Sequence, residues 1–136
     1  MKSPALVAVE QPAEAFAALF AAAAERGERL GWLDLAAADE LPSPLAAAAA
    51  AGAAKAVAVS ARGALAWKRR RGAAVTRDLL REHFLGFGAV LVRGGAGWPR
   101  LAPSAAGFRF ESAVGRVREL PAEALLAELL RPRHRA

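Results

Sequence analysis

The sequence of 136 residues contains no cysteine, so neither a disulfide framework nor a metal site with cysteine ligands is possible. A chain without cysteine agrees with a reducing compartment, and we expect the protein to be cytoplasmic. Histidine is almost as scarce, and the two histidines, His83 and His134, lie far apart in the sequence. Because a metal site needs further ligands close by, we predict none. We interpret His83 as a packed or half-buried helix residue and His134 as part of a tail.

Segments typical of membrane or secreted proteins are also missing. The apolar stretch of residues 45–67 is long enough to span a bilayer, but it is mostly alanine and contains two charged residues and two glycines. At the amino terminus, the apolar part of residues 6–9 is too short for a signal peptide and meets Glu10 directly. We therefore expect no membrane partner.

The turn after the first expected strand lacks the residues of a phosphate-binding loop. Such a loop has glycines that let backbone N–H groups surround the phosphates, a lysine, and a Ser or Thr for magnesium. Positions 10–16 instead read Glu-Gln-Pro-Ala-Glu-Ala-Phe. Two carboxylates would repel a triphosphate, Pro12 has no N–H donor, and Phe16 stands where a hydroxyl is needed. The sequence therefore favours a protein that is not an enzyme of nucleotide hydrolysis.

The chain does have the length and the apolar content of one α/β domain. We predict a single-domain three-layer sandwich of residues 1–130, with a mostly parallel sheet and peripheral hairpins, followed by a basic tail of residues 131–136. The run of residues 5–9 is continuously apolar, as in a strand that is buried on both faces of a sheet.

Apolar periodicity and turn residues predict the elements in order. We expect strands at residues 5–9, 30–35, 56–60, 64–67 and 89–92, helices at residues 12–26, 45–53, 76–85 and after 121, an edge segment at residues 98–101, and a hairpin of residues 108–111 and 116–120. We expect residues 55–97 to form half of an α/β domain, around which the rest of the chain is arranged. Its last loop follows the carboxyl end of a strand, where open parallel sheets bind ligands.

That glycine-rich loop is the candidate ligand site. Guanidinium groups and an indole ring flank the glycines, so the loop is suited to an anionic or planar ligand. The candidate residues are Arg93, Gly94, Gly95, Gly97, Trp98 and Arg100. Asp34, Ser60 and Arg62 are expected near the same sheet edge, either at this site or as ordinary turn and capping residues. A solvated flexible loop is the alternative interpretation.

The net charge of +6 raises the question of a polyanionic partner. Two runs concentrate basic residues, namely Lys68, Arg69, Arg70 and Arg71, and residues 131–135. We interpret them as a solvated turn and a chain end. A nucleic-acid or polyanion-binding module is the alternative, because a basic surface gains affinity by releasing counterions from phosphates. A third hypothesis is an enzyme that uses residues 93–100 with Asp34 or Ser60, but no nucleophile and base pair is evident.

Three groups of short stretches resemble one known family. They are Glu-Arg-Gly at 25–27 followed by Leu-Gly-Trp-Leu at 30–33, Ala-Ala-Gly-Ala at 50–53 followed by Val-Ala-Val-Ser-Ala-Arg at 57–62 and Ala-Leu-Ala-Trp at 64–67, and Val-Leu-Val-Arg-Gly at 90–94 followed by Trp-Pro-Arg-Leu at 98–101. Together they resemble the MobB family of molybdopterin-guanine dinucleotide biosynthesis adapter proteins, over residues 5–101.

The resemblance implies a fold like that of phosphate-loop GTP-binding proteins, with a degenerate P-loop. The family's glycine-rich loop with its lysine is absent, and the acid before Gly94 is replaced by Arg93. The polar segment before the alanine helix is reduced to residues 40–44. The resemblance therefore implies a non-catalytic adapter or subunit, a homodimer or hetero-oligomer, that docks on a molybdoenzyme or a cofactor assembly protein. Arg93 also makes the sheet edge more favourable to a molybdopterin-type ligand with its phosphate.

Overall fold

The computed structural model describes residues 3–35, 42–70, 72, 75–94 and 97–134. The contacts of the chain gather in two compact units, one of residues 1–36 and 77–136 and the other of residues 37–76, and each unit is described by itself. The division into a domain of residues 1–130 and a tail stays a prediction. Within the described part of the chain, no helix has the length and apolar character needed to cross a bilayer.

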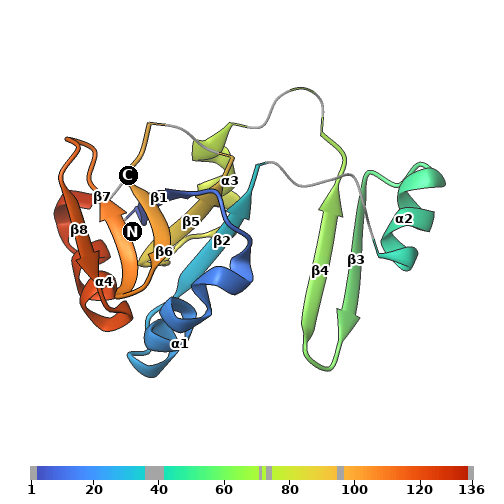
Figure 1. Cartoon of the computed structure of the whole chain (residues 1–136). Helices are drawn as coiled ribbons and strands as arrows, with labels where there is room; N and C mark the ends of the chain where they lie inside the picture. Colours follow the sequence, from blue (N-terminus) through green and yellow to red (C-terminus); the bar gives the residue numbers. More distant parts are fainter. Residues whose placement is uncertain (1–2, 36–41, 71, 73–74, 95–96, 135–136) are drawn as a thin grey trace. The chain divides into compact units, whose positions relative to one another are not determined.

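The larger unit contains a six-stranded sheet (Figure 1). Its strands lie in the order β2 (Leu30–Asp34), β5 (Ala89–Arg93), β1 (Ala5–Val9), β6 (Arg100–Ser104), β7 (Gly107–Glu111) and β8 (Val117–Leu120). The first four strands of this order are parallel, and β7 and β8 continue the sheet in antiparallel fashion. The predicted α/β fold with a mostly parallel sheet is confirmed, as is the hairpin of β7 and β8.

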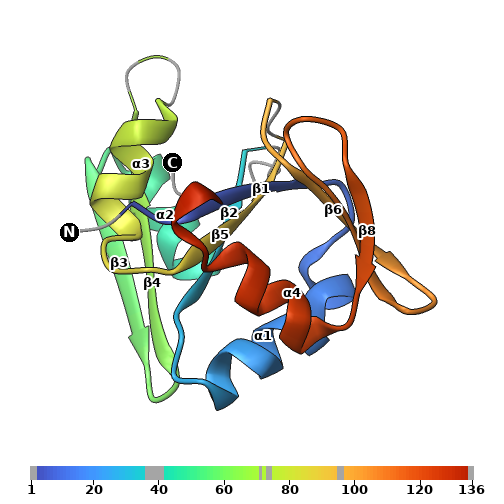
Figure 2. The same cartoon turned by 90° about the vertical axis from the view of Figure 1, so that its left-hand side faces the viewer.

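Helices cover both faces of this sheet (Figure 2). The short 3-10 helix η1 (Ala13–Phe16), α1 (Ala17–Glu25) and α4 (Ala122–Leu129) pack on the face of Val7 and Leu91. The opposite face, with Leu6 and Val90, contacts Leu80 of α3 (Thr76–His83). Successive side chains of a strand point to opposite faces, so the continuously apolar β1 serves two cores at once.

The end of α1 shows how local sequence stops a helix. Gly27 has a φ of 67°, the left-handed conformation that glycine adopts without steric cost. The N–H of Glu28 donates to the carbonyl of Ala23 at 2.9 Å, and the N–H of Gly27 donates to the carbonyl of Ala24 at 3.1 Å. Because these bonds satisfy carbonyls at the helix end, Gly27 caps α1 directly after residue 26, where the sequence predicts that the helix ends.

The smaller unit consists of α2 (Ser43–Ala50) and the antiparallel strands β3 (Lys55–Ser60) and β4 (Gly63–Lys68). These two strands form a sheet of their own. The prediction that residues 55–97 form half of one α/β sheet is therefore wrong, because β5 pairs with β1 and β2 and not with the hairpin. Apolar alternation and a turn predict a hairpin, but strand edges are chemically alike and do not encode the sheet that they join.

Residues 98–101 were expected at a sheet edge, and this prediction is wrong. The strand β6 lies between β1 and β7. It pairs with β7 over its whole length, from Arg100 opposite Glu111 to Ser104 opposite Gly107. Its register with β1 is limited to one pair, Ala8 opposite Arg100.

Candidate functional site

The carboxyl ends of β2 and β5 bring two predicted site residues together. Asp34 and Arg93 are opposite in register, and Nη1 of Arg93 lies 3.5 Å from Oδ2 of Asp34. Gly94 follows with a φ of 84°. The guanidinium of Arg93 therefore already faces a carboxylate, which lowers the positive potential that it offers to an anion.

The other residues of the predicted glycine loop separate in space. Trp98 packs against the cluster of Leu6, Val90 and Val92 on one sheet face. Arg100 begins β6 and is exposed, while Gly95 lies outside the described residues. The indole thus contributes to the core as well as to the surface. A ligand role for these residues stays a prediction.

Ser60 and Arg62 form the turn of the β3–β4 hairpin. The Oγ of Ser60 accepts the N–H of Arg62 at 3.3 Å and lies 3.4 Å from the carbonyl oxygen of Gly63, to which it donates. Both residues belong to the two-stranded sheet, so the prediction that they share a sheet edge with Asp34 is wrong. Their contacts are those of turn residues.

The basic run after β4 has a partly structural role. Nη2 of Arg69 donates to the carbonyl oxygens of Ala49 at 2.7 Å and Ala53 at 3.5 Å, and its guanidinium lies 4.9 Å from the ring centre of Trp67. Arg69 therefore binds carbonyls at the end of α2, where a cation is favourable. Lys68 and Arg70 are exposed, and Arg71 lies outside the described residues. Polyanion binding by this run stays a prediction.

The turn after β1 is held by the chain itself. The N–H of Ala15 donates to the carbonyl of Pro12 at 3.0 Å, which closes η1. The ring of Phe16 is fully buried, 6.1 Å from Phe108 in a stacked arrangement and 6.1 Å from Trp32. Residue Phe16 is therefore part of the core that joins β1 to β2 and β7.

A small polar hollow lies beside this turn. Its volume is about 170 Å³, and two carboxylates and two guanidiniums line it, those of Glu10, Glu111, Arg100 and Arg109. Small-molecule sites in proteins usually measure about 300–1,000 Å³. The hollow is therefore small for a nucleotide, and its charges balance.

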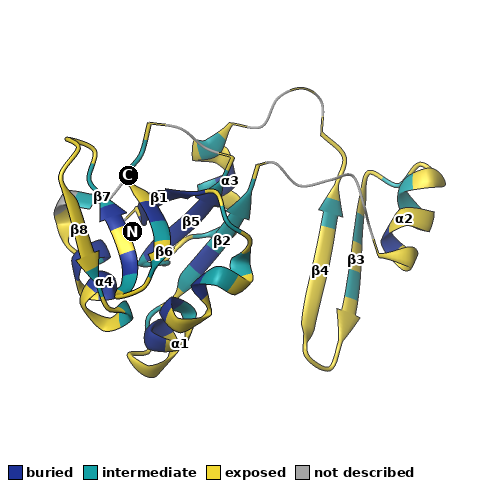
Figure 3. Cartoon of the chain, viewed as in Figure 1, coloured by how far each residue is buried: buried dark blue, intermediate teal, exposed yellow. Residues whose placement is uncertain are grey.

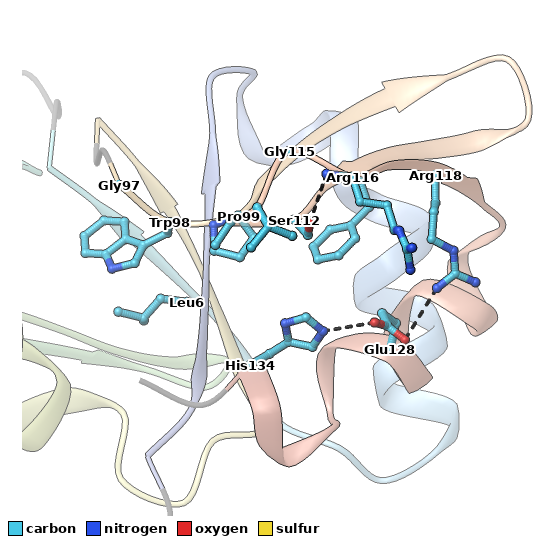
Figure 4. Close-up of a pocket in the computed structure, with 13 residues that line it drawn as sticks. Leu6, Gly97, Trp98, Pro99, Ser112, Gly115, Arg116, Arg118, Glu128 and His134 are labelled. Carbon is cyan, nitrogen blue, oxygen red and sulfur yellow. Dashed lines mark hydrogen bonds and ion pairs between the residues drawn. The ribbon is translucent and has the colours of Figure 1, made fainter.

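A larger cavity lies elsewhere in the same unit (Figure 4), and its volume is about 780 Å³. It opens between β1, the segment before β6, the turn between β7 and β8, and the end of α4. Its lining comprises Leu6, Gly97, Trp98, Pro99, Phe110, Ser112, Ala113, Val114, Gly115, Arg116, Arg118, Glu128 and His134. Sequence patterns pointed to only Gly97 and Trp98 among them, and for another site. The sequence feature that could have located the other lining residues is Glu128, an acid among the inward-facing leucines of α4.

A buried carboxylate organises the polar end of this cavity. Oε1 of Glu128 lies 3.0 Å from Nε2 of His134, and its Oε2 lies 3.2 Å from Nε of Arg131 and 3.7 Å from Nη1 of Arg118. The sequence analysis placed His134 in a tail, and this prediction is wrong. His134 packs edge-on against Phe110, and only 11% of its side chain is exposed. The physical reason is that the buried acid needs partners, and the 3-10 turn η2 (Pro132–His134) brings one.

Comparisons with known proteins bear on the fold. No protein-family model and no curated protein matches the chain. A crystal structure of Bacillus subtilis MobB is similar, with a TM-score of 0.50 and 22% sequence identity over 71% of this chain and 65% of the MobB chain. A second structure of Bacillus subtilis MobB has a TM-score of 0.49 and 23% identity over 71% of this chain and 62% of that one. The chain thus spans less than two thirds of the length of these MobB chains, and the first similarity shows a MobB-like fold.

Proposed function

We propose that this chain is a non-catalytic adapter or subunit in the handling of the molybdenum cofactor, molybdopterin guanine dinucleotide. In this proposal, the MobB-like fold has been kept and its phosphate-binding loop has degenerated. Two lines of support are the fold similarity to Bacillus subtilis MobB and the sequence resemblance over residues 5–101. The position of Phe16 carries the non-catalytic part of the proposal.

Phe16 occupies the place where a phosphate loop needs a hydroxyl, and its ring is fully buried between Phe108 and Trp32. A turn anchored in this way cannot open around a triphosphate without losing part of the core. Glu10 and Glu111 line the adjacent hollow together with Arg100 and Arg109, so the hollow offers no net positive charge to phosphate oxygens. Both features argue against a nucleotide at the end of β1.

Isothermal titration calorimetry with GTP and magnesium tests this part. We expect no saturable heat at nucleotide concentrations up to about 1 mM, the range of weak specific binding. A phosphate-loop GTP-binding protein in the same buffer serves as the positive control. Micromolar binding of GTP would contradict the loss of the site.

The β3–β4 hairpin supports the adapter part of the proposal. Val57 and Val59 lie on the same side of the hairpin as Ala66 and Ala64, their partners in register. We call these four residues the valine face. The two valines are 55% and 79% exposed. Most of β3 and β4 belongs to the exposed class (Figure 3), and an isolated two-stranded sheet is marginally stable in water. A partner that covers the valine face would supply the missing apolar contacts.

The partner that we propose for the valine face is a second copy of the chain. Exposed apolar patches are typical of protein–protein contacts, and a symmetric dimer buries the same patch on both copies. Light scattering after gel filtration should give a mass of about twice the 14.1 kDa of the chain. V57K/V59K should be monomeric, because lysines oppose burial of this face. V114K, which changes a valine that is 91% exposed in the other unit, is the matched control and should remain dimeric.

Purification from its own cells tests the functional assignment. A molybdoenzyme or a protein of cofactor assembly should be retained with the chain, and V57K/V59K should reduce its recovery if the dimer is needed for docking. A wild-type chain that is monomeric at all concentrations would contradict the homodimer. Recovery of nucleic acid in place of such a protein would favour the polyanion-binding alternative.

A further inference from the structure

The 780 Å³ cavity forms where two parallel strands part. The N–H of Ala8 donates to the carbonyl of Pro99 at 2.7 Å, and the register of β1 with β6 holds only where Ala8 is opposite Arg100. On the amino-terminal side of this point, Leu6 of β1 and Trp98 before β6 line the opening. The cavity thus lies beside the single point where β1 and β6 pair, and the segment between β5 and β6 forms one of its walls.

The cavity has an apolar end and a polar end. Figure 4 shows Leu6, Trp98 and Pro99 on one side and Arg116, Arg118 and Glu128 on the other, with His134 below. Cavities with this volume, an apolar lining and a few convergent polar groups are typical of small-molecule sites.

The polar end carries an excess of positive charge. Glu128 is its one carboxylate, and Arg118, Arg131 and the imidazole of His134 already surround it. Arg116 lines the same cavity, and within the described residues no acidic side chain forms an ion pair with it. Its guanidinium is therefore available to an anion that enters the cavity.

The turn that carries Arg116 is held in place by its own hydrogen bonds. The Oγ of Ser112 accepts the N–H of Arg116 at 3.1 Å, and the N–H of Ser112 donates to the carbonyl of Arg116 at 2.9 Å. At the tip of this turn, Val114 is 91% exposed at the rim of the cavity. An apolar side chain at a rim favours a ligand with an apolar body over one that is polar throughout.

We propose that this cavity binds an amphiphilic anion, a molecule with an apolar body and one carboxylate. The apolar body lies against Leu6, Trp98 and Phe110, and the carboxylate pairs with Arg116. The ligand class follows from the excess cation at one end and the apolar walls at the other. Arg116 is exposed, and a carboxylate replaces the water at its guanidinium with a charge-assisted pair. The site is independent of the adapter role and of the turn after β1.

Octanoate is the probe, and octanamide is its uncharged counterpart. In W32F/W67F, Trp98 is the one remaining tryptophan of the chain and reports directly on the cavity. Octanoate should change its emission with a dissociation constant on the order of 1 mM, as expected for about ten heavy atoms. Octanamide should bind about tenfold more weakly, because it cannot form the charge-assisted pair.

Variants of Arg116 test whether the carboxylate of octanoate pairs with this residue. R116Q should weaken octanoate binding about tenfold and leave octanamide binding unchanged, while R116K should retain most of the affinity for octanoate. R77Q removes an exposed arginine from α3 and should have no effect. Circular dichroism and the thermal midpoint of each variant show that the fold is intact.

Three results would overturn the proposal. They are equal affinity of the wild-type chain for octanoate and octanamide, the same loss of affinity in R77Q as in R116Q, and unchanged Trp98 emission at about 10 mM octanoate, well above the expected dissociation constant. The comparison of the two probes in the wild-type chain needs no substitution, so it holds even if a variant does not fold.

Discussion

Nε2 of His134 lies 3.0 Å from Oε1 of Glu128, which ties the last described residue of the chain to the buried side of α4. The same carboxylate is within 3.7 Å of Arg118 on β8 and 3.2 Å of Arg131. One acid therefore joins three elements of the larger unit. An acid so far from water is stable only when such partners surround it.

Replacement of this acid by its neutral isostere should destabilise the protein. Glu128→Gln leaves Arg118, Arg131 and His134 around an amide that carries no charge. We expect the free energy of unfolding to fall by about 2–3 kcal/mol, less than for a fully buried pair because the arginines are 48% and 58% exposed. Urea denaturation measures the change. Glu123→Gln on an exposed position of the same helix should stay within about 0.5 kcal/mol, and an equal loss in both variants would contradict the assignment.

A hydroxyl at position 16 should not restore a phosphate site. Phe16→Ser removes a fully buried ring from between Phe108 and Trp32, so we expect a loss of about 3–5 kcal/mol of stability. GTP should remain unbound in calorimetry, because the glycines and the lysine are still missing. Phe20→Ser, at a partly buried position, should cost less. A stable F16S variant that binds GTP would show that the aromatic residue blocks a competent loop.

The segment that follows α3 packs closely on β2, so one glycine should be sensitive to a single methyl group. A Cβ atom at Gly31 would lie 2.7 Å from the ring of Phe84 and 3.1 Å from that of Phe87. Gly31→Ala should therefore lower the free energy of unfolding by about 1–3 kcal/mol, as expected for overpacking. Gly63→Ala is the control, since its Cβ meets no atom within 4 Å. A thermal midpoint that is the same in both variants would mean that the rings move aside freely.

Loss of the arginine at the end of α2 should loosen that helix. Arg69→Gln removes the guanidinium from the carbonyl of Ala49, and amide exchange in α2 should become about threefold faster, as expected for a weak charge interaction at a helix end. Arg70→Gln removes an exposed neighbouring charge and should leave these rates unchanged. Exchange that responds equally to both substitutions would point to net charge as the cause.

Local patterns sufficed for most helices and strands. Apolar periodicity predicts the helices at residues 12–26 and after 121, and apolar residues at that spacing are buried, namely Phe16 and Leu19 near the first and Leu125, Leu126 and Leu129 in the last. These predictions succeed because the spacing of apolar residues along a few turns decides which side of an element is apolar.

The candidate site was less accessible to such reasoning. Asp34 and Arg93 were both predicted near the carboxyl edge, and they do meet there, because the ends of parallel neighbours coincide. Glu128 and Arg116 were not predicted. Both residues line the cavity because the turn between β7 and β8 lies beside the end of α4. The spacing of residues within one segment does not encode which segments lie side by side.

The sequence by itself determined the buried first strand, the end of the first helix before Gly27 and the lack of phosphate-loop residues at positions 10–16, since each depends on residues within one short segment. Only the tertiary structure decided that the hairpin forms its own sheet, that β6 lies inside the larger one, and that Glu128 gathers cations beside a cavity. The physical reason is that backbone edges are alike in every strand, so the choice of partner is made by packing between segments far apart in the chain.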